Sequence, residues 1–174
     1  MNCVSQQGLT LPELLISLSL AAILLAGAAP AFSNLLQSSR NSAHTNELHS
    51  AVNFARAQAI QTRRSVSICS GTDQCRNSRR WQQQLLIFID HNRDGQLDAG
   101  EQLLRTTELS GDVHWYWSNF RQRSHLTFKP DGTTHSLNGT FTLCRQQNAQ
   151  RSIVINITGR SMSTTPSNAL ACTL

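Results

Sequence analysis

An apolar run from Leu14 to Phe32 constrains the fold of this chain more than any other feature. At about 1.5 Å of rise per residue, a helix over this run is just long enough to cross the hydrocarbon core of a membrane, which is about 30 Å thick. No other segment of the 174-residue sequence is a candidate membrane span. The sequence therefore predicts one membrane helix attached to one further domain.

The segment before this run differs from an ordinary secretory signal. It carries no basic side chain, and its small residue, Gly8, precedes the apolar run instead of following it. Glu13 places a carboxylate at the edge of the membrane helix, where an unpaired charge is costly. If the chain is cut between Gly8 and Leu9, the new amino terminus of a neighbouring subunit could neutralise Glu13. This arrangement favours subunits that stack in a bundle of membrane helices.

The stretch Gly8–Leu15, with the sequence GLTLPELL, resembles the prepilin motif of type IV pilins and type II secretion pseudopilins. In that family a membrane peptidase cuts after the glycine and N-methylates the new first residue. The resemblance implies cleavage after Gly8, methylation of Leu9 and a role for Glu13 in assembly. Leu9 departs from the phenylalanine that is usual after the cut, and a plain anchor or signal sequence is the alternative. The expected divisions are a leader at 1–8, a membrane helix at 9–33 and a periplasmic head at 34–174.

The polarity changes after Phe32, but the pattern continues to predict a helix. Apolar residues recur with a period near 3.6, so one helix is expected from about Leu11 to Arg64. Its predicted buried face consists of Leu36, Ala43, Leu48, Val52, Ala55 and Ala59.

Strand patterns follow from Ser65 onward. The segments 66–69, 84–89, 115–117, 126–128, 140–144 and 152–157 are expected as strands, with turns at Lys129–Gly132 and Asn138-Gly139. The predicted fold class is therefore α+β: a lollipop like that of type IV pilins, whose long helix packs on an antiparallel head.

Weaker motifs in the head resemble the GspH/FimT group of minor pilins and H-type pseudopilins. They are Ala55–Ile60, Val66–Cys69 with Trp81, Phe88–Asp90 with Leu104-Arg105, Phe128–Gly132, and Gly159-Arg160. The resemblance implies a subunit near a fibre tip that helps to initiate assembly and is not an enzyme. The implied partners are other minor pilins or pseudopilins, the major pilin, the prepilin peptidase and the inner-membrane assembly platform. The implied location is the inner membrane with a periplasmic head, and then the tip of a pilus or pseudopilus.

Five cysteines are present, and Cys3 lies in the segment that processing would remove. The remaining four form a close pair, Cys69 and Cys75, and a distant pair, Cys144 and Cys172. They show no CxxC spacing, so disulfides in an oxidising compartment are favoured over a zinc site. The sequence allows three connectivities, of which Cys69–Cys75 with Cys144–Cys172 is favoured.

An acidic segment matches the oxygen-ligand spacing of an EF-hand calcium loop. Its candidate ligands are Asp90, Asn92, Asp94, Asp98 and Glu101, with Gly95 at the sixth position. The segment before it reads as a strand instead of a helix, so an Asx-rich hairpin turn is the alternative. No cofactor is expected to be required, and calcium is the one candidate.

The chain is basic, with 15 Lys and Arg against 10 Asp and Glu. Such a balance attracts nucleic acid or anionic surfaces, although a solvated arginine-rich face has the same composition. Some members of the group bind DNA through a C-terminal Gly-Arg-x-Arg motif, in which Met162 here replaces the second arginine. The resemblance implies DNA uptake as an alternative function. The candidate phosphate contacts are Arg145, Arg151 and Arg160, and a second basic cluster is Arg76, Arg79 and Arg80 beside Trp81 as a stacking residue.

Overall fold

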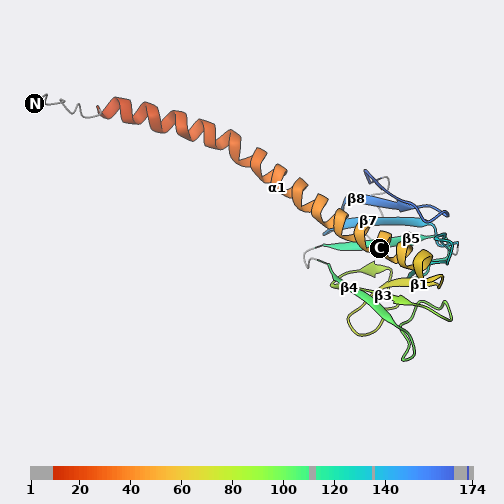
Figure 1. Ribbon diagram of the computed structural model, residues 1–174. Coiled ribbons are helices and arrows are strands. Elements are labelled where there is room, and N and C mark those ends of the chain that lie inside the picture. Colours follow the sequence, from red (N-terminus) through yellow and green to blue (C-terminus); the bar gives the residue numbers. More distant parts are fainter. Residues whose placement is uncertain (1–9, 110–112, 135, 167–171, 173–174) are drawn as a thin grey trace, which may run out of the picture. The chain divides into compact units, whose positions relative to one another are not determined.

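The computed structural model describes residues 10–109, 113–134, 136–166 and Cys172, apart from the side chain of Ala29. The chain divides into two compact units, Met1–Arg40 and Asn41–Leu174. The elements of the described residues are α1 (Leu11–Thr62), β1 (Val66–Ser70), β2 (Arg80–Trp81), β3 (Gln84–Ile89), β4 (Leu103–Glu108), β5 (His114–Asn119), β6 (Leu126–Phe128), β7 (Gly139–Arg145), β8 (Asn148–Ile155) and β9 (Ser161–Thr164). Figure 1 shows these elements coloured along the chain.

The first unit consists of the N-terminal part of α1, and its apolar surface has no cover within the unit. Every described side chain from Leu11 to Arg40 is exposed. The hydroxyl groups of Ser17, Ser19 and Ser33 donate hydrogen bonds to helix carbonyls at 2.8–2.9 Å, so these polar groups are satisfied within the helix. Such a surface suits an apolar solvent or other apolar helices better than water.

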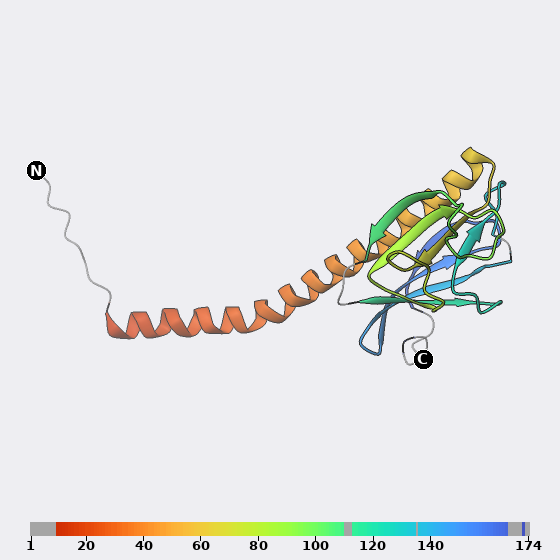
Figure 2. The ribbon, with the colours of Figure 1, turned by 90° about the horizontal axis from the view of Figure 1, so that it is seen from below.

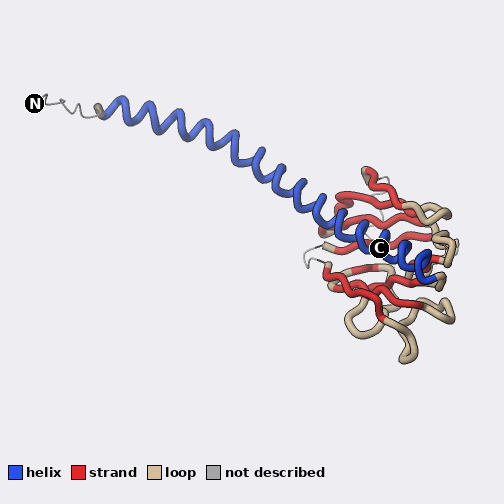
Figure 3. The backbone as a smooth tube through the Cα atoms, viewed as in Figure 1, coloured by secondary structure: helices blue, strands red, loops and turns tan. Residues whose placement is uncertain are grey.

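The second unit contains two antiparallel sheets, shown as red strands in Figure 3. The first sheet has the strand order β4-β3-β1-β6, and the second has the order β2-β5-β7-β8-β9. The α+β class of the sequence prediction is confirmed, with one long helix packed on antiparallel sheets.

The part of α1 in the second unit joins the two sheets. Leu48, Ala51, Val52, Ala55 and Ala59 are fully buried, and they share one apolar core with strands of both sheets. Figure 2 shows the last turns of α1 lying along the strands. The small residues on this face let the helix backbone approach the sheets closely. The predicted apolar face is therefore correct from Leu48 onward.

The predicted face is wrong before Leu48, where Leu36 and Ala43 are exposed. Polar residues are buried there instead: Asn41, His44 and Thr45. The Asn41 amide donates a hydrogen bond to the Gln150 side chain at 3.1 Å, and the Thr45 hydroxyl donates one to the Asn41 carbonyl at 2.7 Å. Hydrogen bonds of this kind offset the burial of polar groups, and hydrophobic periodicity cannot detect them.

The six predicted strands correspond to β1, β3, β5, β6, β7 and β8, with shifted ends. The sequence missed β2, β4 and β9, each of which lies at an edge of its sheet. The side chains of β4 and β9 are mostly exposed, so neither strand carries the alternating apolar pattern of a half-buried strand. Their pairing with β3 and β8 defines them instead.

The predicted tight turn at Asn138-Gly139 is wrong. Gly139 is the first residue of β7, where it pairs with Asn119 of β5 and Ile155 of β8. A Cβ at this position would lie 2.2 Å from the Ser118 carbonyl oxygen, so the glycine permits close approach of β5. The turn predicted at Lys129–Gly132 is present, because the Gly132 amide donates to the Lys129 carbonyl at 2.8 Å.

Two disulfides are present, and they have the pairing that the sequence favours. Cys69 bonds to Cys75, which ties β1 to the segment before β2. Cys144 of β7 bonds to Cys172, and both pack with Tyr116 in a small buried cluster. The second disulfide therefore holds Cys172 against the sheet, 28 residues along the chain from Cys144.

Three of the motifs that resemble the GspH/FimT group meet around Arg56. Its Nε donates to the Gly132 carbonyl at 2.9 Å, and one of its terminal nitrogens donates to the Thr158 carbonyl at 3.4 Å. Gly159 has φ of +77°, and a Cβ there would lie 2.0 Å from the Gly132 carbonyl oxygen. One guanidinium thus joins two turns to α1, and the glycine lets them touch.

We expect Gly159→Ala to lower the free energy of unfolding of the head by about 2–4 kcal/mol, since it adds a steric clash to an unfavourable backbone conformation. Urea unfolding of the full chain in detergent measures this change. Gly100→Ala is the matched control, because a Cβ there meets nothing within 4 Å, and it should change stability by less than about 0.5 kcal/mol. Equal stability of the two variants would contradict the close contact.

Candidate functional sites

Glu13 lies in the first turn of α1, and its side chain is exposed. Gly8 and Leu9, the predicted cleavage and methylation residues, lie outside the described residues. Among the residues that are described, no cation forms an ion pair with Glu13. From Leu14 to Ser39 the sequence carries no further ionisable side chain. A positive charge for Glu13 must therefore come from elsewhere in the chain or from another molecule.

The part of the chain that the structure describes contains one helix, Leu11–Thr62, with a segment long and apolar enough to cross a membrane. None of that segment is buried inside the chain. A core helix of a soluble domain would instead pack this surface against other elements. The exposed segment thus fits a membrane anchor, in agreement with the sequence prediction.

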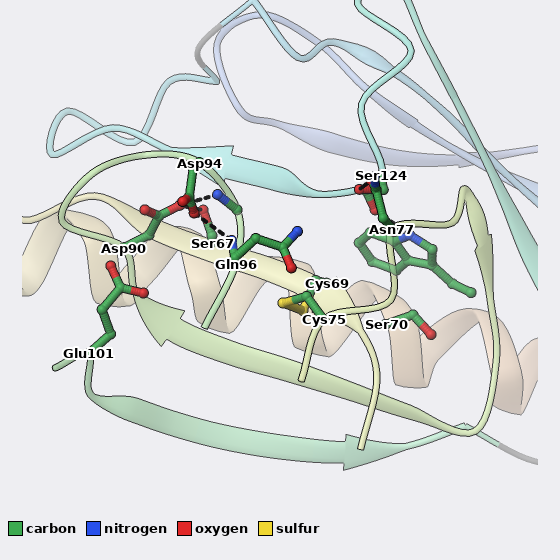
Figure 4. The surroundings of a disulfide bond; sticks show 12 residues. Ser67, Cys69, Ser70, Cys75, Asn77, Asp90, Asp94, Gln96, Glu101 and Ser124 are labelled. Carbon is green, nitrogen blue, oxygen red and sulfur yellow. Dashed lines mark hydrogen bonds between the residues drawn. A yellow bond between two sulfur atoms is a disulfide. The ribbon is translucent and has the colours of Figure 1, made fainter. Parts of the chain in front are cut away.

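Asp90 organises the start of the acidic loop from a fully buried position at the end of β3. Its Oδ2 accepts hydrogen bonds from the Ser67 hydroxyl at 2.5 Å and the Gly95 amide at 3.0 Å (Figure 4). Its Oδ1 accepts a bond from the Arg93 amide at 2.5 Å, and the Thr127 hydroxyl lies 2.6 Å from the Ser67 hydroxyl. The carboxylate therefore ties the loop to β1 and β6.

The rest of the loop is an Asx-rich connection between β3 and β4. The Asn92 side-chain amide donates to Asp94 and Asp98 at 2.9 and 3.0 Å. Both carboxylate oxygens of Glu101 accept backbone amides, from His91 at 2.7 Å and from Asp98 at 3.3 Å. These bonds satisfy the loop without a cation.

The candidate calcium ligands do not form a gathered metal site. In the described ranges no three His, Cys, Asp or Glu side chains come together as a group that could hold a metal ion. Coordination by Asn92 would require its amide oxygen, whereas its nitrogen faces the carboxylates here. Calcium binding by this loop therefore stays a prediction of its sequence.

The three arginines predicted for DNA binding do not form one cluster. Arg145 ends β7 beside the turn into β8, whereas Arg160 lies just before β9, at the opposite end of the β7–β8 ladder. Arg151 of β8 is half-buried and lines a small cavity with Ser42 and Thr45 of α1. DNA binding through these residues stays a prediction.

The second basic cluster also differs from the expectation. Trp81 is fully buried, so it cannot stack on a nucleic-acid base. Its indole nitrogen donates to the Ser124 carbonyl at 2.8 Å. The Arg79 guanidinium lies 5.4 Å from the centre of the Tyr116 ring, within the range of a cation–π contact. These contacts join the segment around β2 to β5 and to the chain that follows β5.

Sequence reasoning missed the roles of Arg56 and Asp90. Arg56 is a single cation among the small buried residues of α1, and this position is the only sequence feature that points to a structural role for its side chain. Asp90 follows the buried run of β3, which is a signal that its carboxylate is buried too. Their partners come from distant segments, so the sequence alone does not reveal the contacts.

Two family models match the chain. The model for the type II transport protein GspH matches residues 44–159, and the model for the prokaryotic N-terminal methylation motif matches residues 4–29. The chain belongs to the GspH family. The GspH match spans the C-terminal part of α1 and the sheets up to Gly159. It therefore covers two of the motifs that meet around Arg56, Ala55–Ile60 and Phe128–Gly132, and ends at Gly159 of the third.

Solved structures give the same fold. The type IV minor pilin FimU of Pseudomonas aeruginosa, in two crystal forms, matches with 23% sequence identity and a TM-score of 0.55. The match covers 74% and 76% of this chain and 98% of each FimU chain. A comparison with curated protein sequences found no match. The GspH-family protein thus has the pilin-like fold predicted from its sequence.

The acidic motif predicts that millimolar calcium raises the melting temperature of the GspH-family chain, because a ligand that binds only the folded state stabilises it. Differential scanning calorimetry of the full chain in detergent measures the shift, and a chelator should reverse it. The double variant Asp94→Asn/Asp98→Asn should lose the response, and magnesium provides the control ion. An unchanged melting temperature in calcium would contradict the motif.

Proposed function

We propose that this GspH-family chain is a minor pilin or H-type pseudopilin that helps to initiate assembly of a type IV pilus or a type II secretion pseudopilus. It acts as a structural subunit and not as an enzyme. The observation that carries this proposal is the uncovered apolar surface of α1 from Leu11 to Phe32, with one carboxylate at its start. A subunit that moves from a membrane into a fibre needs such a surface in both places.

The chemistry of α1 supports both stages. Before assembly, lipid of the inner membrane covers the apolar side chains. After assembly, the corresponding helices of neighbouring subunits cover them, and Glu13 pairs with the methylated amino terminus that cleavage after Gly8 creates at Leu9 of a neighbour. An ion pair buried among apolar helices also fixes the axial position of one subunit against the next.

The head supports a periplasmic location. Its disulfides Cys69–Cys75 and Cys144–Cys172 suit an oxidising compartment. Its partners are other minor pilins or pseudopilins and the major pilin, while the prepilin peptidase and the inner-membrane platform act on the anchored subunit. The family model is named for type II transport, and the solved relative is a type IV minor pilin. The proposal therefore includes both a type II secretion pseudopilus and a type IV pilus.

Gly8→Ala should block removal of the leader, because the peptidase cuts after this glycine in the proposed reaction. The protein should then keep residues 1–8, which intact mass spectrometry of the membrane fraction detects directly. Gly27→Ala is the matched control: it changes a glycine within α1 whose added Cβ meets nothing within 4 Å. Normal maturation of the Gly8 variant would contradict the assigned cleavage site.

Glu13→Ala should leave cleavage intact but reduce the subunit in sheared surface fibres, or in an isolated pseudopilus, at least about tenfold. That reduction corresponds to a loss of only about 1.4 kcal/mol. Quantitative mass spectrometry of the fibre and membrane fractions measures it, and also shows which fibre holds the native subunit. Glu13→Asp keeps the charge and should retain more incorporation than Glu13→Ala. Native levels of Glu13→Ala in the fibre would rule out the ion pair.

A further inference from the structure

Phe120 is the most exposed large apolar side chain among those the structure describes. It follows β5, and 89% of its surface is accessible. Arg121, Gln122 and Arg123 come next and are also exposed. We call Phe120–Arg123 the Phe120 loop. A single exposed apolar residue is common on protein surfaces, so its neighbours decide whether this one has a role.

The Phe120 loop is held in one conformation from both ends. The Asn119 side chain donates to the Arg123 carbonyl at 2.8 Å and accepts from the Arg123 amide at 3.0 Å. The Gln122 amide donates to the Asn119 carbonyl at 3.1 Å, and Gln122 has a positive φ of 53°. A loop ordered in this way loses little further conformational entropy when it binds a partner.

Buried indoles fix the segment that follows the loop. The Trp81 nitrogen donates to the Ser124 carbonyl at 2.8 Å, and the Trp117 nitrogen donates to the His125 carbonyl at 3.1 Å. Both rings are fully buried, and Trp117 stacks on Phe141 with ring centres 4.1 Å apart. The core of the head therefore positions the residues beside the Phe120 loop.

A polar groove of about 670 Å³ lies along the Phe120 loop. Arg121 and Arg123 line it from the loop, Asp94 and Gln96 from the β3–β4 connection, and Asn77 from the segment before β2. The Ser124 hydroxyl donates to the Asn77 side chain at 2.8 Å, and Figure 4 shows this pair together. Three separate segments thus build the groove, and the Ser124–Asn77 hydrogen bond joins two of them directly.

The charge of the groove comes mainly from arginine. Arg121 and Arg123 also border a smaller cavity of about 50 Å³, together with Arg93 and His125. Within the described ranges, neither Arg121 nor Arg123 forms an ion pair with a carboxylate. Burial lowers the pKa of His125, against the opposing effect of Asp90, so its imidazole adds little positive charge at neutral pH. Unpaired guanidinium groups bind carboxylates with paired hydrogen bonds.

The composition of the groove favours a polypeptide over nucleic acid. Asp94, which also lines the groove, would repel a phosphate backbone, whereas it can accept hydrogen bonds from amides or cations of a protein segment. The amide side chains of Asn77, Gln96 and Gln122 both donate and accept hydrogen bonds. Exposed aromatic residues beside arginine are also the residue types enriched at the centres of protein interfaces.

We propose that the Phe120 loop and its groove dock a segment of a neighbouring pilin-like subunit. That segment brings a carboxylate to Arg121 and Arg123 and an apolar pocket to Phe120. This inference rests on the proposed function, and it adds the surface of the head through which one neighbour is recognised.

Site-specific photo-cross-linking tests the inference with the full chain in its native host. A photoreactive phenylalanine analogue replaces Phe120, and the same analogue at Met162, which is 63% exposed on β9, provides the control. We expect position 120 to cross-link to a subunit with a prepilin motif, through a peptide that contains Asp or Glu. Cross-linking no stronger than at Met162, or only to proteins without that motif, would overturn the inference.

Charge reversal tests the role of the arginines. Arg121→Glu/Arg123→Glu should lower the cross-link yield about tenfold or more, as expected for residues at the centre of an interface. Arg160→Glu, an exposed arginine before β9, should leave the yield unchanged. Both arginines are exposed, so the melting temperature of the double variant should equal that of the native chain. An undiminished cross-link in the folded double variant would overturn the inference.

Nucleic acid is the competing occupant, and a fluorescent single-stranded oligonucleotide tests it. We expect the arginine reversal to lower its affinity for the full chain in detergent by less than about tenfold, as a general effect of net charge. A tenfold loss of that affinity, with the protein cross-link unchanged, would overturn the docking of a subunit. Absence of the unmodified chain from fibres and pseudopili would instead contradict the proposed function. Its presence there without the cross-link would contradict this inference alone.

Discussion

The uncovered apolar surface of α1 restricts the surroundings in which this protein is stable. Between Leu11 and Arg40 every described side chain is exposed, and the serine hydroxyls are satisfied within the helix. Water is a poor solvent for a surface of this size. In the proposed function, lipid or the helices of other subunits cover this surface, and Glu13 pairs with a positive charge in the same surroundings. The exposed apolar helix and the carboxylate at its start support the proposed pilin-like role.

The head, in contrast, buries most of its apolar side chains within the chain and pairs buried polar groups there. Residues of α1 from Leu48 to Ala59 share one apolar core with strands of both sheets. Trp81 and Trp117 belong to the same core, and their indole nitrogens donate to the segment after β5. The buried carboxylate of Asp90 holds the acidic loop, and Arg56 holds two turns. The same contacts that stabilise the head thereby fix the positions of its surface loops.

Local patterns succeeded where burial repeats regularly along the chain. The length of α1 and the presence of β1, β3, β5, β6, β7 and β8 follow from periodicity. Periodicity failed for edge strands such as β4 and β9, whose side chains face solvent. The turn predicted at Gly139 was also wrong, because the glycine there permits the close approach of the Ser118 carbonyl and does not form a turn.

The sequence by itself determined the family, the long apolar helix and the N-terminal methylation motif. Hydrophobicity is a property of each segment, and a peptidase that acts on a short motif reads only neighbouring residues. The tertiary structure alone decided that Arg56 would join two turns, that Arg145 and Arg160 would lie apart, and that the Phe120 loop would border a groove. These features depend on contacts between segments distant in sequence, and strand pairing and core packing set those contacts.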